Sequence, residues 1–143
     1  MLPEKIQLDI VTPERAVLSE AVDELILPGT EGYLGVRPGH APLLTTLKVG
    51  TIEIRKGNDR QYLSVSWGFV EVLPDRVSIL AETAERAEEI DVDRAVRAKE
   101  RAEQRLKSPD PDVDFHRAQV ALEKALIRIQ VASKAGAASR GEI

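Results

Sequence analysis

Basic side chains recur at helical spacing in the C-terminal part of the 143-residue chain and are its clearest candidates for chemistry. A helix turns about 100° per residue, so they would form two stripes, each about 40° wide. The stripes contain Arg94, Arg101 and Arg105, and then Arg117, Lys124 and Arg128. Arginine binds phosphate or carboxylate through two parallel N–H bonds, so a nucleotide or an acidic protein segment would suit them. An ordinary solvated helix face carries similar charges, and the pattern alone leaves both interpretations open.

Few other residues in the sequence are of the types and spacing that form a catalytic site. The chain contains no cysteine, which excludes disulfides, thiol catalysis and cysteine-ligated metal sites. Of its two histidines, His40 is best explained by hydrogen bonding within a loop, and His116 by simple exposure. The glycine-rich segment 29–35 leads toward another extended segment, so it predicts turns and not a phosphate-binding loop. These features favour a binding or regulatory protein over an enzyme.

The charge balance limits the choice of partner. The chain carries 20 basic and 24 acidic side chains, and its net charge of −4 resides entirely in residues 1–87. General nucleic-acid binding depends on cationic contacts to phosphate, so an acidic chain is a poor candidate. No apolar run approaches the ~18–20 residues of a membrane span. We therefore expect no nucleic-acid partner, no metal and no direct membrane span.

Residues 1–87 predict a domain of short strands. Apolar and polar residues alternate in runs bounded by glycine and proline turns, most clearly at 6–11, 52–55 and 77–81. Such runs without intervening helical patterns indicate an antiparallel β-sandwich or barrel. Trp67 and Phe69 are expected in the core of this domain or in an interface.

Residues 88–134 predict an antiparallel hairpin of two helices. Ala95, Ala98 and Ala102 follow at spacings of three and four, and the prolines at 109 and 111 end the first helix near Lys107. Asp112 or Asp114 can cap the second helix. Its apolar seam contains Phe115, Ala118, Leu122, Ala125, Ile129 and Ala132. Alanine seams bury little area, so we expect a weakly held hairpin that can leave its resting place, followed by a flexible tail at 135–143.

A loop pattern rich in glycine and proline connects the chain to a known family. The stretch from Gly32 to Thr45 resembles the signature of the epsilon subunit of F-type ATP synthases, and the resemblance covers almost the whole chain. Its signature residues, expected in structural or interface roles, are Gly35, Pro38, Gly39, His40, Ala41 and Pro42. One departure is Trp67, where the resemblance predicts glycine or a small residue.

The resemblance implies a ten-stranded sandwich, a two-helix domain and a non-catalytic role in the central stalk. The sandwich would bind the gamma subunit and contact the c-ring of a proton-translocating synthase. The hairpin would pack on the sandwich, or extend along gamma toward the alpha and beta catalytic subunits and inhibit ATP hydrolysis. Such a subunit would work as a peripheral protein on the cytoplasmic side of the bacterial inner membrane.

A second motif implies nucleotide binding by the hairpin. Residues 90–95 match the Ile/Leu-Asp-x-x-Arg-Ala motif of bacterial relatives that bind ATP. By resemblance, the candidate ATP contacts are Glu85, Ile90, Asp91, Arg94, Ala95, Arg101, Lys124 and Arg128. Lys124 replaces an expected arginine and so loses the two-pronged donor, while Asp91 would serve equally well as a helix N-cap. ATP is thus expected as a regulatory ligand and not as a required cofactor. The alternative is a purely structural rotor adaptor without nucleotide sensing.

Overall fold

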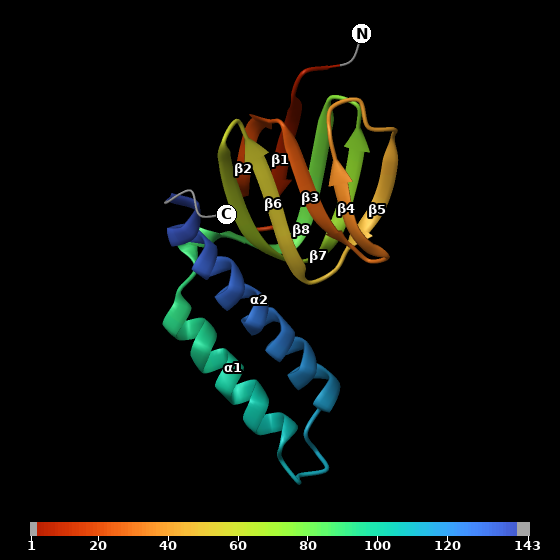
Figure 1. Cartoon of the computed structure of the whole chain (residues 1–143). Helices are drawn as coiled ribbons and strands as arrows, with labels where there is room; N and C mark the ends of the chain where they lie inside the picture. The colour runs from red at the N-terminus through yellow and green to blue at the C-terminus, as the bar shows by residue number, and fades with distance from the viewer. Residues whose placement is uncertain (1–2, 140–143) are drawn as a thin grey trace.

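The chain folds into a β-sandwich followed by two contacting antiparallel helices, which confirms the predicted fold class (Figure 1). The structure, a computed structural model, describes residues 3–139, with side chains described for residues 3–135. The first four strands are β1 (Ile6–Val11), β2 (Ala16–Val22), β3 (Glu24–Gly29) and β4 (Gly32–Val36). The next four are β5 (Leu43–Leu47), β6 (Gly50–Lys56), β7 (Asp59–Leu73) and β8 (Arg76–Arg86). The short 3-10 helix η1 (Ala87–Glu89) precedes α1 (Val92–Leu106) and α2 (Phe115–Ser139).

The strands pair in the order β2-β1-β8-β7-β5-β3-β4, and β6 joins β3 and β7. The pairs are antiparallel except for β1 and β8, which run parallel with Leu8 opposite Val77. The expectation of a wholly antiparallel sandwich is therefore wrong at this pair. The two strands come from opposite ends of the domain, so no tight turn between them imposes an antiparallel direction.

A single long strand, β7, passes from one layer of the sandwich to the other. Residues 59–65 pair with β6, residues 68–72 pair with β5, and β8 follows β7 on both sides of the change. The ten strands implied by the family resemblance are therefore eight within residues 3–139. The numbers differ because β7 and β8 each contribute to both layers without a break.

The change of layer occurs at Trp67 and Gly68. Trp67 has φ 45°, and it is the one non-glycine residue with positive φ in the described part of the chain. A bulky side chain rarely adopts this left-handed backbone, which glycine adopts without strain. Gly68 has φ 155°, and a Cβ added there would lie 2.2 Å from the Leu80 carbonyl oxygen. The bend thus requires glycine at position 68 and strains the backbone at Trp67.

The main hydrophobic core lies between the two layers. The alternating residues predicted from sequence point inward, as shown by the complete burial of Ile6, Leu8, Ile10, Ile52 and Ile54. Trp67 and Phe69 do not belong to this core, because they are 37% and 59% exposed. Of the two locations predicted for Trp67, the structure selects an interface, since its ring faces the hairpin residue Lys124. Phe69 lies on the outer face of the sandwich.

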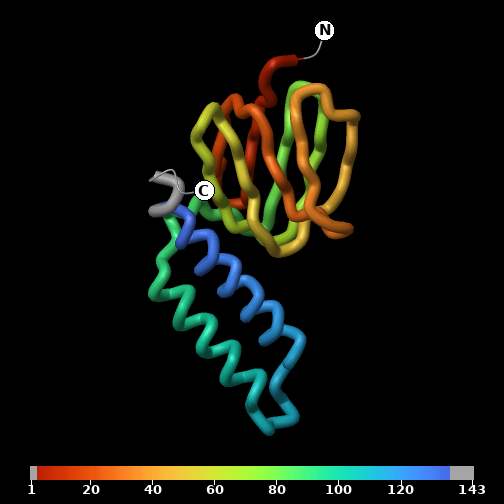
Figure 2. Tube along the Cα trace, viewed as in Figure 1, coloured from red at the N-terminus to blue at the C-terminus, as the bar shows by residue number. Residues whose placement is uncertain are grey.

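The hairpin follows its predicted capping and most of its predicted seam, but Phe115 does not belong to the seam: it is the first residue of α2, next to the turn, and is 46% exposed. Asp114 caps α2 by accepting a hydrogen bond from the Arg117 amide at 3.0 Å, and alanines from both helices are buried where the helices meet. α2 extends beyond the predicted end at residue 134 to Ser139, within the stretch where we expected a tail, and residues 140–143 lie outside the described part. α2 provides most of the contact with the sandwich, while the turn between the helices lies away from it (Figure 2).

The bend in β7 yields the first prediction. Gly68→Ala should lower the free energy of unfolding by about 1–3 kcal/mol, because it adds strain and a clash with the Leu80 carbonyl. Gly35→Ala is the matched control, since a Cβ at Gly35 meets nothing within 4 Å, and its effect should stay within about 0.5 kcal/mol. Urea unfolding of the two variants measures the difference. Equal stability of both variants would contradict the strained bend.

Candidate functional site

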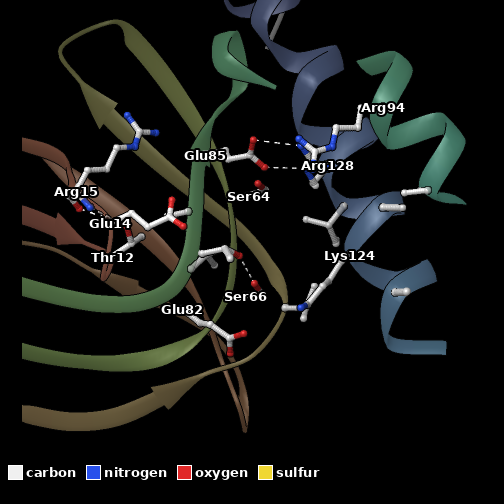
Figure 3. Close-up of a pocket in the computed structure, with 18 residues that line it drawn as sticks. Thr12, Glu14, Arg15, Ser64, Ser66, Glu82, Glu85, Arg94, Lys124 and Arg128 are labelled. Carbon is white, nitrogen blue, oxygen red and sulfur yellow. Dashed lines mark hydrogen bonds and ion pairs between the residues drawn. The ribbon is translucent and has the colours of Figure 1, made fainter. Parts of the chain in front are cut away.

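A cavity of about 590 Å³ lies between the sandwich and the hairpin (Figure 3). The sandwich lines it with polar side chains, including Arg15, Ser64, Ser66, Glu82 and Glu85. The hairpin lines it with three cationic side chains and with small apolar ones: Arg94, Lys124, Arg128, Ala98, Ala121 and Ala125. The cavity therefore has a cationic wall on the hairpin side, whereas the sandwich wall also carries the carboxylates of Glu14, Glu82 and Glu85.

The helices bring the three cations together by simple geometry. Lys124 and Arg128 are four residues apart on α2 and so share one face of the helix. Arg94 lies in the first turn of α1, where the backbone amides and the helix dipole also favour an anion. The alanines between these residues have short side chains and leave the cavity open. The predicted stripes therefore converge only in part, because Arg101, Arg105 and Arg117 are exposed and do not line the cavity.

One ion pair crosses the cavity from the sandwich to the hairpin. Arg128 Nε donates to Glu85 Oε1 at 2.7 Å, and Arg128 Nη2 donates to Glu85 Oε2 at 3.2 Å. Both side chains are partly buried, and two parallel N–H···O bonds make this the strong form of an arginine–carboxylate pair. Two of the predicted ATP contacts thus bind each other directly in this structure.

The remaining residues of the predicted nucleotide motif have structural partners here. The Asp91 carboxylate accepts a hydrogen bond from the Arg94 amide at 3.1 Å and so caps α1. Ala95 is buried in the hairpin. Ile90 is buried with Tyr62, Ala87 and Val131 in a small apolar cluster where the hairpin joins the sandwich.

Tyr62 anchors this junction. Its hydroxyl donates to the Glu53 carboxylate at 3.0 Å, and the Lys134 ammonium lies 5.5 Å from the centroid of its ring. Burial, together with the Glu53 hydrogen bond, raises the pKa of Tyr62 to about 12. The phenol therefore stays neutral at physiological pH and continues to donate its proton.

The signature loop lies on the sandwich and does not line the cavity. Gly39 has φ 87°, and its amide donates to the Pro74 carbonyl at 2.7 Å. His40 Nδ1 lies 2.7 Å from the Ala41 carbonyl oxygen, and its amide donates to the Arg37 carbonyl, which confirms the predicted loop hydrogen bonding of His40. The contacts that the structure gives for His40 are therefore with backbone carbonyls of its own loop.

Sequence reasoning missed two contacts between distant residues. Lys124 Nζ lies 4.4 Å from the centroid of the Trp67 ring, and Arg15 pairs with Glu89 of η1 at 2.9 Å. For the contact between Lys124 and Trp67, the signal in the sequence was that each residue differs from the one that the family resemblance predicts. For the second there was no local signal, since the two residues are far apart in the sequence.

Within residues 3–139, no cluster of three or more histidine and acidic side chains has the arrangement of a metal site. None of the helices described in the structure is long and apolar enough to cross a membrane.

Two family patterns match the chain and together cover most of it. Residues 5–87 match the family described as the beta-sandwich domain of the ATP synthase Delta/Epsilon chain. Residues 88–133 match the long alpha-helix domain of the same chain.

Individual relatives agree with these matches. The chain is 52% identical over 136 residues to ATP synthase epsilon chain 2 of Syntrophotalea carbinolica, covering 94% of this chain and 99% of the relative. It is 53% identical over 126 residues to the ATP synthase epsilon chain of Desulforamulus reducens, covering 88% and 96%.

Among solved structures, one chain of the Euglena gracilis mitochondrial ATP synthase OSCP/F1/c-ring assembly aligns with a TM-score of 0.78 and 27% identity. This alignment covers 95% of the present chain and 83% of the Euglena chain. A chain of the Tetrahymena thermophila mitochondrial ATP synthase central stalk/c-ring structure aligns at 0.56 with 18% identity, covering 94% and 98%, which is a likeness of fold alone.

The electrostatics beside the cavity predict a pH-dependent contribution to stability. The hydrogen bond from Arg15 is the main cause that holds the pKa of Glu89 below its ordinary value, and the Arg86 amide adds to it. A lowered pKa stabilises the fold above the ordinary value of about 4.3, and this contribution is lost as the pH falls through the lowered value. Glu89→Gln should therefore lower the melting temperature by about 1–3 °C at pH 7, and the difference should become smaller at pH 3, as Glu89 begins to be protonated.

Glu88→Gln provides the control, because Glu88 is exposed and adjacent in sequence but forms no ion pair among the described residues. Thermal unfolding at both pH values measures the effect. A difference between Glu89→Gln and the parent chain that is the same at pH 7 and pH 3 would contradict the assignment.

Proposed function

Because this chain belongs to the epsilon-chain family of F-type ATP synthases, whose members are non-catalytic subunits of the central stalk, we propose that it both couples and regulates the rotor. In this proposal the sandwich binds the gamma subunit and contacts the c-ring. The hairpin rests on the sandwich or extends along gamma toward the alpha and beta subunits, where it inhibits ATP hydrolysis. ATP bound in the cavity favours the resting position.

The cavity between the two parts is the observation that carries the regulatory proposal. Its lining takes Glu85 from the sandwich and Arg94, Lys124 and Arg128 from the hairpin. A ligand that contacts both parts binds the resting form better than the extended form, and a ligand shifts an equilibrium only through such a difference in affinity. The cationic hairpin wall of the cavity and the first turn of α1 suit the phosphates of a nucleotide.

The small apolar contact between the hairpin and the sandwich is consistent with a hairpin that moves. Apolar packing at the junction comes from a small cluster centred on Tyr62, Ile90 and Val131, separate from the core of the sandwich. Little apolar area would be exposed on release, so the free-energy cost of extension is modest.

An exposed apolar row on the sandwich supports its role as a docking domain. Val11, Leu80 and Phe69 lie in register across β1, β8 and β7, with Leu44 of β5 beside them. Their exposed fractions are 40%, 56%, 59% and 72% in that order. A contiguous apolar surface of this kind is typical of a protein interface, and the proposal assigns it to gamma.

The second candidate function is a structural adaptor whose hairpin is only a brace. Two observations favour it: Arg128 already has a carboxylate partner in Glu85, and the Asp91 side chain is used as a helix cap. Under this alternative the cations of the cavity stabilise the resting hairpin without any ligand. Attachment to the rotor would place the chain on the cytoplasmic side of the bacterial inner membrane in either case.

Titration with ATP separates the two candidates. Calorimetry of the purified chain should give saturable heat, and Arg94→Ala should weaken binding at least about tenfold by removing a charged contact. Lys124→Arg should bind more tightly, because it adds the two-pronged donor. Arg97→Ala is the control, since Arg97 is exposed on the same helix and does not line the cavity.

Two further variants make the titration sharper. Asp91→Asn keeps a capping side chain, so a loss of affinity would report contact with the ligand and not damage to α1. Arg101→Ala tests the one predicted basic contact that lies outside the cavity lining. Absence of heat at millimolar ATP would favour the brace.

Removal of the hairpin tests inhibition directly. The chain alone should hydrolyse no ATP, and adding it to an epsilon-depleted F1 complex should lower hydrolysis. Deleting residues 91–143 should relieve that inhibition while the sandwich still binds, because its core cluster ends at Ala84. Hydrolysis rates with equal amounts of bound full-length and truncated chain measure the effect. Equal inhibition by both would contradict the role of the hairpin.

A further inference from the structure

A cation–π contact joins the sandwich to the hairpin at the edge of the cavity. Lys124 Nζ lies 4.4 Å from the centroid of the Trp67 ring. The negative face of an indole attracts an ammonium group at this distance more strongly than other aromatic rings do. None of the ion pairs found in residues 3–135 involves Lys124. Among these residues, the Lys124 ammonium therefore interacts with the sandwich through the Trp67 ring.

The backbone that carries this ring is unusual. Trp67 has φ 45° and lies between Ser66 and Gly68, which pair with β8, while Trp67 itself has no partner in the register of either neighbouring strand. A tryptophan in this conformation is strained, and such strain persists where the surrounding structure holds it in place. The bend directs an exposed aromatic ring from the sandwich toward α2.

The contact complements the ion pair on the next turn of the helix. Arg128 binds Glu85 one helical turn beyond Lys124, so two charged side chains on one face of α2 each have a partner on the sandwich. Two attachment points fix the rotation of a helix as well as its position. The apolar cluster around Val131 adds a further attachment nearer the C-terminal end of α2.

We propose that Trp67 is a docking platform that receives Lys124 and latches the hairpin to the sandwich in the absence of nucleotide. The latch rests on the proposed movement of the hairpin, but it does not depend on ATP binding. The latch stabilises the docked hairpin in the absence of ligand, and a bound nucleotide would stabilise the docked hairpin further.

Labels on the two parts test the latch without nucleotide. The chain has no cysteine, so Glu31→Cys and Gln104→Cys, both at exposed positions, allow specific spin labelling of the sandwich and the hairpin. Distance distributions are measured in urea below the unfolding of the sandwich, where docked and undocked forms coexist. Lys124→Met keeps most of the side chain but removes its charge, and it should raise the undocked-to-docked ratio about two- to fivefold.

The tryptophan itself gives an independent readout. Trp67 is the single tryptophan of the chain, so intrinsic fluorescence reports on this site alone. Its accessibility to acrylamide should increase in Lys124→Met together with the undocked fraction. Unchanged distances and unchanged accessibility in this variant would overturn the latch.

A glycine variant separates latching from ordinary packing. Trp67→Gly removes the ring and relieves the strained backbone, so it should undock the hairpin without lowering the melting temperature of the sandwich. Lys124→Met should then have no further effect in the Trp67→Gly background. Additive effects of the two substitutions would show that the residues act separately and would overturn the proposal.

Two hairpin variants distinguish failure of the latch from failure of the movement. Arg97→Met removes an exposed cation outside the cavity and should leave the distances unchanged. Arg128→Met removes the Glu85 ion pair and should undock the hairpin. If Arg128→Met undocks it and Lys124→Met does not, the latch is wrong and the movement stands. If neither undocks it, both the latch and the proposed movement fail.

Discussion

The passage of β7 through both layers of the sandwich constrains every surface that the chain uses. Before the bend, β7 presents Tyr62 to the hairpin junction and Ser64 to the cavity. After the bend, the same strand presents Phe69 to the exposed apolar row. Because Gly68 packs against the β8 backbone, the bend holds these surfaces in a fixed relation. One rigid strand thus connects the side of the domain that faces the hairpin with the side that is free to meet a partner.

The two hydrophobic clusters differ greatly in size, and this difference explains how the chain can be both rigid and adjustable. The core of the sandwich contains residues from all eight strands and none from the helices. The junction adds a few apolar side chains, while partly exposed charged contacts orient α2. Such contacts contribute little stability individually, but they require a defined geometry. The hairpin therefore has a preferred position without being part of the core.

Local patterns in the sequence predicted the features that depend on local physics. Alternation identified the buried faces of the strands, and the prolines at 109 and 111 marked the end of the first helix. Asp112 and Asp114 were both predicted as caps of the second helix, and the structure selects Asp114. The parallel pairing of β1 with β8, the continuity of β7 and the exposure of Arg101 depend on how distant segments meet, and helical spacing alone could not predict them. The two departures from the family pattern, Trp67 and Lys124, are in contact. Each was visible in the sequence, but their proximity was not.

The parallel pairing of the first and last strands of the sandwich also determines when the domain can fold during synthesis. β1 has one partner, β2, close in the chain, and its other partner, β8, is made some seventy residues later. Until β8 leaves the ribosome, the β1–β2 hairpin has an unpaired edge and an uncovered row formed by Ile6, Leu8 and Ile10. Contacts of such long range slow folding, whereas the helical hairpin forms from neighbouring segments. The β1–β2 hairpin is therefore prone to aggregation until β8 is available to cover its unpaired edge.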